Sequence, residues 1–331
     1  MNWLITGGCG FIGINLINKI LKISQENNIR VVDNLSVGSR EKLSQVTKFA
    51  EICNTDEIGN SFEYRVELIV GDIKNPNLAL NVTKNIDVII HLAGNTGVFP
   101  SVINPRNDFD NNALGVFNYL EAARVNKVEK FVFASSGAPA GEVIPPIDES
   151  VLPKPISPYG ASKLLGEGYC SAYYGSFQID TVCLRFSNVY GPRSGHKSSV
   201  VAQFLSQSLN EKKIQIYGTG KQTRDFIFID DLVEAIIRSV ERSNIGGEVF
   251  QIASGIETSL NDLAEHLKEA LINNHLAFPG IEYKQKRKGD VMRNFARIDK
   301  AKYMLDWFPK TDLSHGLDIT VKYFLNEKFA K

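Results

Sequence analysis

Two residues of this 331-residue sequence, Tyr159 and Lys163, have the types and the spacing needed for proton transfer. They follow Ser157 and Pro158, which are typical of the cap and the first position of a helix, so both side chains are predicted to lie on one helix face. A phenol titrates near ~10, and an ammonium one turn away favours its phenolate. Tyr159 is therefore a candidate general base, although the same pair taken alone also fits an exposed surface position.

Serines at the end of a predicted strand favour the catalytic interpretation. Ser135 and Ser136 close the apolar run 130–135, and open α/β sheets bind ligands at the carboxyl ends of their strands. A hydroxyl there could hydrogen-bond the substrate oxygen that Tyr159 deprotonates. We therefore predict a catalytic set of Ser136, Tyr159 and Lys163.

A glycine-rich segment after the first predicted strand suits a diphosphate. Gly7, Gly10 and Gly13 fit a tight turn, a close approach of the backbone to the phosphates, and close packing of a helix on a strand. The N-terminus of that helix offers N–H groups and a positive dipole end. Asp33 ends the next strand, where a carboxylate would bond an adenosine ribose and repel a 2′-phosphate. The pattern favours NAD over NADP, although Arg40 lies nearby in the sequence; the alternative is a glycine turn with an unrelated acid.

The other cofactor contacts are predicted at the ends of later strands. Asp72 could bond the adenine amino group, whereas His91 stands in an apolar run and is predicted to be a core histidine. The cationic ring of an oxidised nicotinamide would further favour the Tyr159 phenolate. The full predicted set for NAD is Gly7, Gly10, Phe11, Ile12, Gly13, Asp33, Asn34, Asp72, Ile73, Leu92, Ala93, Tyr159 and Lys163.

Short β-branched runs alternate with amphipathic stretches, which predicts the elements that hold these residues. The predicted strands are 2–6, 29–33, 67–71, 87–92, 130–135, 181–186 and 249–253, and the predicted helices are 13–23, 113–124, 158–174, 200–211 and 231–240. Such alternation with apolar strands predicts an α/β fold, a Rossmann-type doubly wound parallel sheet with a smaller mixed α/β C-terminal lobe. We predict an NAD-binding domain at 1–187, to which 225–255 returns, and a substrate lobe at 188–224 and 256–331.

The composition argues against several classes of protein. The chain has 37 Lys and Arg residues and 37 Asp and Glu residues, so its net charge is zero and does not favour binding to nucleic acid or to an anionic membrane. Four scattered cysteines and five histidines without ligand spacing predict reduced thiols and no metal site. No apolar stretch is long enough for a membrane span, and the sequence enters a strand pattern at once, so we predict a cytoplasmic protein.

The motifs together identify a resemblance that covers nearly the whole chain. The sequence resembles the extended short-chain dehydrogenase/reductase proteins that modify nucleotide sugars, the group of the UDP-sugar 4-epimerases and NDP-sugar 4,6-dehydratases. The matching stretches, in family order, are TGGCGFIG at 6–13, VDNL at 32–35, GDI at 71–73, HLAG at 91–94, NALG at 112–115, the serines at 135–136, PYGASK at 158–163, LRFSNVYGP at 184–192, RDFIFIDD at 224–231 and RKGD at 287–290.

The resemblance implies a tightly held NAD, a serine–tyrosine–lysine catalytic set and a UDP-sugar substrate in the C-terminal lobe. It also implies a homodimer formed through a helix bundle that includes the Tyr159 helix. By motif, Asn188 should contact the sugar nucleotide, and Arg224 and Arg287 should hold its diphosphate. Guanidinium groups match phosphate oxygens, and a neutral chain needs such local cations.

Departures from the family pattern favour one reaction. The 4,6-dehydratases carry an Asp-Glu pair after the catalytic Ser/Thr, where this chain has Gly137 and Ala138, and a family tyrosine is replaced by Ala140. Hydride chemistry with a single base remains, which suits 4-epimerization through a transient 4-keto sugar. One alternative is 4-oxidation coupled to 5-epimerization or dehydration in surface-glycan synthesis. Others are a non-catalytic dinucleotide sensor, against which the complete catalytic set argues, and an NADP reductase that releases its cofactor, which Asp33 disfavours.

One further position bears on the choice of sugar. In the family, the residue five places after the glycine of Arg-x-Gly-Asp lines the pocket beside the sugar's 2-substituent, and a tyrosine there closes it. That position is Asn294, which is smaller and could hydrogen-bond an acetamido group. We therefore predict an N-acetylated UDP-hexosamine in preference to UDP-glucose alone; the alternatives are a solvent-facing Asn294 or an alignment shifted to Phe295.

Overall fold

A computed structural model describes residues 1–55, 58, 61–195, 199–286 and 291–329. The chain forms two compact units. Unit 1 comprises Met1–Glu142, Glu149–Arg185 and Ile236–Phe250, and unit 2 comprises Val143–Asp148, Phe186–Ala235 and Gln251–Lys331. Each unit is described by itself below.

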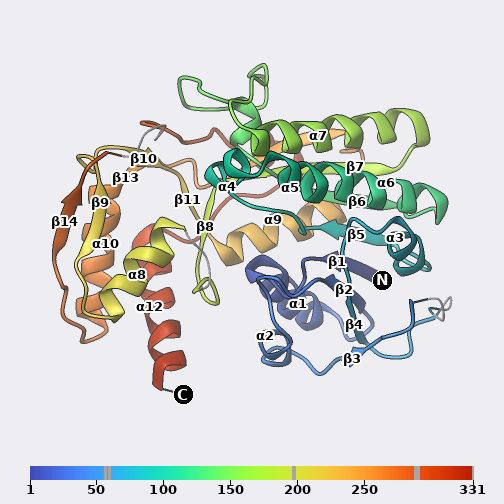
Figure 1. Ribbon diagram of the computed structural model, residues 1–331, viewed down its shortest axis with the longest axis horizontal. Coiled ribbons are helices and arrows are strands. Elements are labelled where there is room, and N and C mark those ends of the chain that lie inside the picture. Colours follow the sequence, from blue (N-terminus) through green and yellow to red (C-terminus); the bar gives the residue numbers. More distant parts are fainter. Residues whose placement is uncertain (56–57, 59–60, 196–198, 287–290, 330–331) are drawn as a thin grey trace. The chain divides into compact units, whose positions relative to one another are not determined.

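Unit 1 is built on an eight-stranded sheet (Figure 1). Its strands are β1 (Asn2–Thr6), β2 (Asn28–Asp33), β3 (Ala50–Glu51), β4 (Val66–Val70), β5 (Val88–His91), β6 (Lys130–Ser136), β7 (Asp180–Phe186) and β12 (Glu248–Ile252), in the spatial order β12-β7-β6-β5-β1-β2-β4-β3. The pairs of β1 with β2 and β5, of β4 with β2 and β3, and of β5 with β6 are parallel. The order reverses at β1, and ligands of such sheets bind at this switch point, beyond the carboxyl ends of the strands. The predicted doubly wound sheet is confirmed.

Helices pack on both faces of the sheet because its strands are apolar on both sides. The helical elements of this part of the chain are α1 (Phe11–Ile23), α2 (Arg40–Ser44), α3 (Pro76–Val82), α4 (Val98–Ile103), α5 (Pro105–Phe109), the π-helix η2 (Asp110–Leu114), α6 (Gly115–Val125), the 3₁₀ helix η3 (Ala138–Ala140), α7 (Pro158–Phe177) and α9 (Ile229–Glu241), which crosses into unit 2. One core contains Leu4, Val32 and Ile89 of the strands together with apolar residues of α3, α6 and α7. On the other face, α1 places Ile17 near Val31 beside Gly8.

Unit 2 joins helices to short paired strands. Its elements are β8 (Asn188–Tyr190), α8 (Val200–Leu209), β9 (Ile214–Tyr217), β10 (Thr223–Arg224), β11 (Phe226–Phe228), β13 (Thr258–Ser259), α10 (Leu260–Asn273), β14 (Ile281–Lys284), α11 (Asp299–Leu305) and α12 (Leu313–Phe329). The strands pair as β8 with β11, β9 with β14, and β10 with β13. Helices α10 and α12 pack on each other. The predicted smaller mixed lobe is confirmed.

The predicted elements are present and differ from the prediction at their ends, whereas other elements were not predicted, namely α2, α3, α4, α5, α10, α11, α12 and the strands β3, β8, β9, β10, β11, β13 and β14. The seven predicted strands are present to within one residue at most ends, and Ser157 caps α7 by accepting the Gly160 N–H at 3.1 Å, as predicted. The helix predicted at 113–124 begins instead as the π-helix at Asp110 and becomes α6 at Gly115. Helix α8 stops at Leu209, two residues early, because Glu211 adopts a positive φ of 57°.

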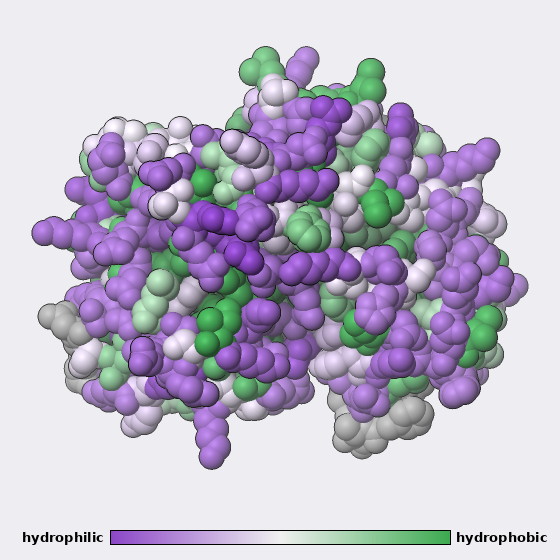
Figure 2. Space-filling model, turned by 180° about the vertical axis from the view of Figure 1, so that it is seen from behind, coloured by the Kyte–Doolittle hydropathy of each residue, from purple (hydrophilic) through white to green (hydrophobic). Residues whose placement is uncertain are grey.

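The face of the molecule in Figure 2 is mostly hydrophilic, and the hydrophobic side chains there stand in small groups. Scattered apolar side chains of this kind are normal on a folded protein. Among the described residues, none of the helices combines the length and hydropathy of a bilayer span.

Candidate active site

The glycine loop between β1 and α1 is closely packed on its inner side. Gly7 has a φ of 69°, and a Cβ there would lie 2.9 Å from the Ala93 nitrogen. A Cβ on Gly13 would lie 2.5 Å from the Cα of Gly8, so only glycine lets α1 begin this close to the loop. Gly10 differs, since within 4 Å its Cβ would meet only the Gly7 carbonyl oxygen, at 3.2 Å. The backbone is thus accessible at Gly10, in front of the N–H groups of the first turn of α1.

The loop is held against the end of β2 by Asp33. This carboxylate is 8% exposed and accepts the Cys9 N–H at 3.0 Å and the Leu35 N–H at 2.8 Å. Burial raises its pKa and the two backbone hydrogen bonds oppose that shift. Arg40 is engaged elsewhere, because its guanidinium bonds both oxygens of Glu51 at 2.7 Å. An acid fixed at this place, with the nearby arginine paired, fits the ribose of NAD and disfavours a 2′-phosphate.

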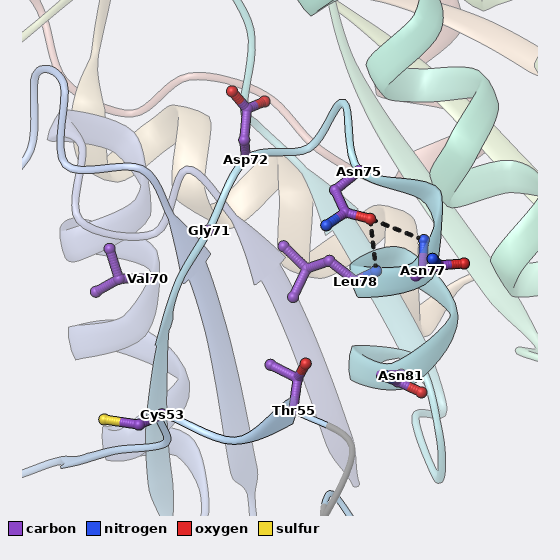
Figure 3. A pocket seen from close by; sticks show the side chains of 9 residues that line it. All are labelled: Cys53, Thr55, Val70, Gly71, Asp72, Asn75, Asn77, Leu78 and Asn81. Atoms are coloured by element: carbon purple, nitrogen blue, oxygen red, sulfur yellow. Dashed lines mark hydrogen bonds between the residues drawn. The ribbon is translucent and has the colours of Figure 1, made fainter.

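A cavity of about 370 Å³ lies beside the end of β4, next to the residue predicted to meet adenine (Figure 3). Asp72 accepts the Lys74 N–H at 2.9 Å and pairs with the Lys74 ammonium at 3.3 Å. Figure 3 shows its carboxylate turned away from Thr55, while Asn75 caps α3 through the Asn77 and Leu78 N–H groups. The adenine contact of Asp72 stays a prediction.

The end of β5 is tied to β1 by hydrogen bonds. Leu92 N–H donates to the Thr6 carbonyl and Ala93 N–H to the Thr6 hydroxyl, both at 3.2 Å. His91 is 1% exposed, hydrogen-bonds Thr6 at 3.1 Å and packs on aromatic rings. Burial and the Lys163 charge lower its pKa to about 3, so it is neutral. The prediction of a core histidine is confirmed.

The two serines at the end of β6 hydrogen-bond different residues of the same helix, α7. Ser135 is buried and donates to Glu167 at 2.6 Å, and Glu167 also binds Arg185 in a buried ion pair at 2.7 Å. Ser136 accepts the Ala138 N–H at 3.1 Å and hydrogen-bonds Tyr159. The structure therefore brings Ser136, and not Ser135, to the predicted base.

Tight packing joins the Ser136 strand to the Tyr159 helix. The 3₁₀ helix η3 follows Ser136, and a Cβ on Gly160 would lie 2.6 Å from the Ala138 carbonyl oxygen. Ala140, which replaces the family tyrosine, is fully buried, so its small side chain leaves no opening to solvent. The neutral segment 137–141 is thus a spacer that fixes the first turn of α7 against β6.

Tyr159 and Lys163 lie one turn apart on α7, as predicted. The Lys163 ammonium donates to the Ala134 carbonyl at 2.8 Å and lies 6.0 Å from the centroid of the Tyr159 ring. Burial lowers the Lys163 pKa to about 8, with Asp108 and Glu167 acting in the opposite direction. Burial raises the Tyr159 pKa, and the hydrogen bond from Ser136 opposes that shift. The hydroxyl donor and the nearby ammonium both favour the phenolate, against the effect of burial.

Two buried groups near Lys163 were missed as functional candidates. Asp108 of α5 is 2% exposed, and its Oδ1 accepts from the Asn112 amide at 2.9 Å. Asn112 belonged to a matching motif, but Asp108 is one acid in the polar run NDFDNN, and only its burial distinguishes it. Within the described residues, no cluster of three or more His, Cys, Asp or Glu side chains could hold a metal ion.

The residues predicted to bind the sugar nucleotide belong to unit 2. Asn188 donates to the Asp225 carbonyl at 3.1 Å, and Arg224 donates to the Thr223 and Val291 carbonyls at 2.7 Å. Buried Asp225 holds this region by accepting N–H groups of Ser254 and Gly255 at 2.7 and 3.0 Å. Asn294 is half-buried in an irregular segment, neither fully exposed nor in the core. Arg287 lies outside the described residues.

Comparisons with known proteins agree with this geometry. Residues 3–253 match the family model described as the NAD dependent epimerase/dehydratase family. The chain is 32% identical to a UDP-glucose 4-epimerase of Mycolicibacterium smegmatis, over 99% of both chains. It is similar to the crystal structure of a UDP-glucose 4-epimerase from Thermotoga maritima with UDP-glucose, with a TM-score of 0.87, 32% identity, and 99% and 100% of the two chains covered. A UDP-N-acetylglucosamine 4-epimerase from Methanobrevibacter ruminantium, in complex with UDP-N-acetylmuramic acid, is similar with a TM-score of 0.87 and 29% identity over 98% of each chain.

Proposed function

The chain belongs to the NAD-dependent epimerase/dehydratase family, and on that premise we propose that it is an enzyme that inverts C4 of a UDP-sugar through a transient 4-keto sugar. NAD is the cofactor of the family and supplies reversible oxidation at C4 when bound. The glycine loop and Asp33 fit it, because Gly10 leaves the first turn of α1 accessible and the Asp33 carboxylate is already fixed at the end of β2.

The protein's own groups handle the proton and the position of the sugar. Tyr159 removes the proton of the 4-hydroxyl as oxidation begins and returns it when C4 is reduced from the opposite face. When the sugar is bound, the Ser136 hydroxyl turns its single proton from Tyr159 to the same sugar oxygen as the charge on that oxygen develops. Lys163 keeps a positive charge beside the phenol, which favours the phenolate. The rest of the catalysis is orientation of the sugar.

One observation carries the choice of reaction: the segment after Ser136 contains no acid or base. Gly137, Ala138, Pro139 and Ala140 cannot move protons at C5 or C6, which a dehydratase requires, and Ala140 is fully buried. A single base at C4 suffices for 4-epimerization. The same neutrality argues against 5-epimerization, which needs a proton exchanged at C5.

For the substrate, we propose a UDP-sugar held by unit 2, with the predicted NAD domain at 1–187 and 225–255 and the substrate lobe at 188–224 and 256–331. Asn188, Arg224 and Arg287 are assigned to the nucleotide and its diphosphate, and Asn294 to the 2-substituent of the sugar. A half-buried asparagine suits an acetamido group, since its amide both donates and accepts. The similarity to a UDP-N-acetylglucosamine 4-epimerase supports an N-acetylated hexosamine.

We also propose a homodimer formed by the helices around α7. The elements α4, α5 and η2 pack on α7 and carry exposed apolar side chains. These are Val98, Phe99, Val102, Ile103, Phe109 and Leu114, together with Tyr169 of α7 itself. Exposed apolar side chains gathered on neighbouring helices are typical of a subunit interface. Sedimentation should give the mass of a dimer at micromolar concentration, and a monomer would contradict this proposal.

We propose a cytoplasmic location because the four cysteines, all of which the structure describes, form no disulfide bonds. All four are free thiols, Cys9, Cys170 and Cys183 being buried and Cys53 exposed, and unpaired thiols are typical of a reducing compartment.

The deciding experiment is product analysis by NMR with a panel of UDP-sugars in deuterated water. We expect inversion at C4 with no deuterium at C5 or C6, because Tyr159 acts on the 4-hydroxyl and the segment 137–141 has no acid or base. Deuterium at C5 would indicate that the protein is a 5-epimerase. Loss of water at C6 would indicate a dehydratase. An unchanged sugar together with bound NAD would indicate a non-catalytic sensor.

A further inference from the structure

A carboxylate that the proposed reaction does not use lies buried behind the catalytic helix. Asp108 is 2% exposed, and its Oδ2 has no hydrogen-bond partner among the described residues. Burying a carboxylate without a partner is unfavourable unless a cation compensates its charge. Arg106, the arginine nearest to Asp108 in the sequence, does not compensate this charge, because it lies on the surface and pairs with Asp110 at 3.1 Å. The Lys163 ammonium lies near Asn112, the residue bonded to Asp108, and the Asp108 charge raises the pKa of Lys163.

Asn112 lies against the carboxylate, and its buried amide oxygen has no hydrogen-bond partner among the described residues. Its amide nitrogen donates to Asp108 Oδ1 at 2.9 Å and to the Asn95 carbonyl at 3.2 Å, so the orientation of the amide is fixed. The carbonyl oxygen then points toward Gly94: a Cβ on that glycine would lie 2.5 Å from Asn112 Oδ1 and 3.7 Å from the Lys163 nitrogen. The amide oxygen of Asn112 and the Lys163 ammonium therefore both lie close to Gly94, which has no side chain to separate them.

The irregular helix explains how these groups meet. A π-helical turn at Asp110–Leu114 joins α5 to α6 and is in contact with α7. Such turns insert an extra residue and commonly occur at functional sites. Here Asp108 and Asn112 remain four residues apart and in hydrogen-bond contact across the junction.

We infer that Asp108 is a positioning residue: its buried carboxylate orients the Asn112 amide toward Lys163 and supplies the negative charge that balances the Lys163 ammonium. This inference rests on the proposed function, in which a protonated Lys163 assists the Tyr159 phenolate. Asp108 touches neither the sugar nor the cofactor in this role and acts through Asn112 and Lys163.

The other charged and titratable groups around Lys163 do not replace it. Glu167 of α7 also raises the Lys163 pKa, but its oxygens are taken by Arg185 and Ser135. Cys183 of β7 acts in the same direction but is held as a thiol, because its own pKa is raised well above the usual value, and His91 of β5 is neutral. The charge of Asp108 raises the pKa of Tyr159 as well. Its removal should therefore lower the pKa of both members of the pair.

The test is Asp108→Asn in the NAD-loaded protein, with Asp110→Asn as the matched control on the surface side of the same turn. The amide keeps the shape and can still accept from Asn112, so only the charge is lost. The pH profile of kcat/KM is expected to be bell-shaped, with both of its pKa values set by the coupled tyrosine–lysine pair. In Asp108→Asn the whole profile should move toward lower pH by about one pH unit. At pH values above the wild-type optimum this means about tenfold lower turnover, with no loss on the acid side.

A second measurement separates this inference from the choice of substrate. Near-ultraviolet difference absorbance against Tyr159→Phe follows the Tyr159 phenolate without any sugar, and its titration should shift toward acid in Asp108→Asn. A lowered rate with unmoved pH profile and unmoved phenolate titration would assign Asp108 a purely structural role and overturn the inference. An equal shift in Asp110→Asn would overturn it too. If no UDP-sugar turns over, the proposed function fails, and the phenolate titration still decides the role of Asp108.

Discussion

The predicted site residues of unit 1 and those of unit 2 are held in different ways. The side chains of Ser136, Tyr159 and Lys163 hydrogen-bond one another or nearby backbone groups. The segments that carry them are packed so closely that Gly160 has no room for a Cβ atom. Arg224 and Asn188 bond backbone carbonyls of their own lobe, and Asn294 lies half-buried in an irregular segment. One fold can carry different functions when the residues of its sites differ. Substitutions in unit 1 should therefore change the rate or the cofactor, and those in unit 2 the choice of sugar.

The largest effect is expected for Tyr159→Phe. Loss of the phenol removes the base, so kcat should fall by about 10²–10⁴ while KM and the melting temperature stay nearly constant. Steady-state kinetics with the preferred UDP-sugar measures this. Tyr303→Phe, at a tyrosine that is 91% exposed, is the control and should behave as wild type. Turnover retained in Tyr159→Phe would remove the catalytic assignment.

The two serines of β6 provide a second test within unit 1. Ser136→Ala removes the donor beside Tyr159 and should lower kcat by about 10²–10³. Ser135→Ala breaks only the bond to Glu167 and should cost about 1 kcal/mol in unfolding free energy with turnover nearly unchanged. Kinetics and denaturant unfolding of both variants separate the roles. The opposite pattern would mean that the strand presents the other serine to the sugar.

The glycine loop should tolerate no side chain at Gly13. In Gly13→Ala the added methyl meets the Gly8 Cα at 2.5 Å, so the loop must move, at a cost of about 1–3 kcal/mol. Wild-type protein should release NAD on heating, and the variant should release much less. Gly175→Ala, where a Cβ meets nothing within 4 Å, is the matched control and should retain NAD. Full NAD content in Gly13→Ala would show that the loop is less constrained than its packing indicates.

The smallest and most selective effect is expected in unit 2. Asn294→Tyr should lower kcat/KM for UDP-N-acetylglucosamine by about 10–200-fold and leave UDP-glucose nearly unaffected, because the larger ring fills the space for the 2-substituent. The two substrates are assayed side by side. Equal losses for both sugars would place the determinant of sugar choice elsewhere in unit 2.

Motifs predicted the catalytic elements because they combine a local signal with a fixed place in the sheet. The run of glycines after β1, and the Ser157-Pro158 start of α7, are local in sequence and gave both position and geometry. The π-helix at Asp110–Leu114 gave no such signal, because its extra residue is stabilised by packing against α7. The short strands β8, β9, β11 and β14 were missed for the same reason, since each exists only through its distant partner.

Side-chain partners were harder to predict than elements. Ser135 and Ser136 both hydrogen-bond α7, and which of them reaches Tyr159 depends on how β6 packs against that helix. Asp108 looks like any solvated acid in the sequence, and only the three-dimensional structure shows that it is 2% exposed. Buried charge is a tertiary property, so no local pattern could have identified it.

The edge strand β12 has a consequence for synthesis on the ribosome. It pairs beside β7, and Gly247 N–H donates to the Thr181 carbonyl at 2.7 Å, although some 60 residues that mostly form unit 2 separate the two strands. A nascent chain grows at about 5–20 residues per second, so the edge of β7 stays unpaired for several seconds. During that interval it could template pairing with another chain. Nascent polypeptides that end before Glu248 should therefore be the ones that chaperones bind and that aggregate, and the emergence of β12 should end that exposure.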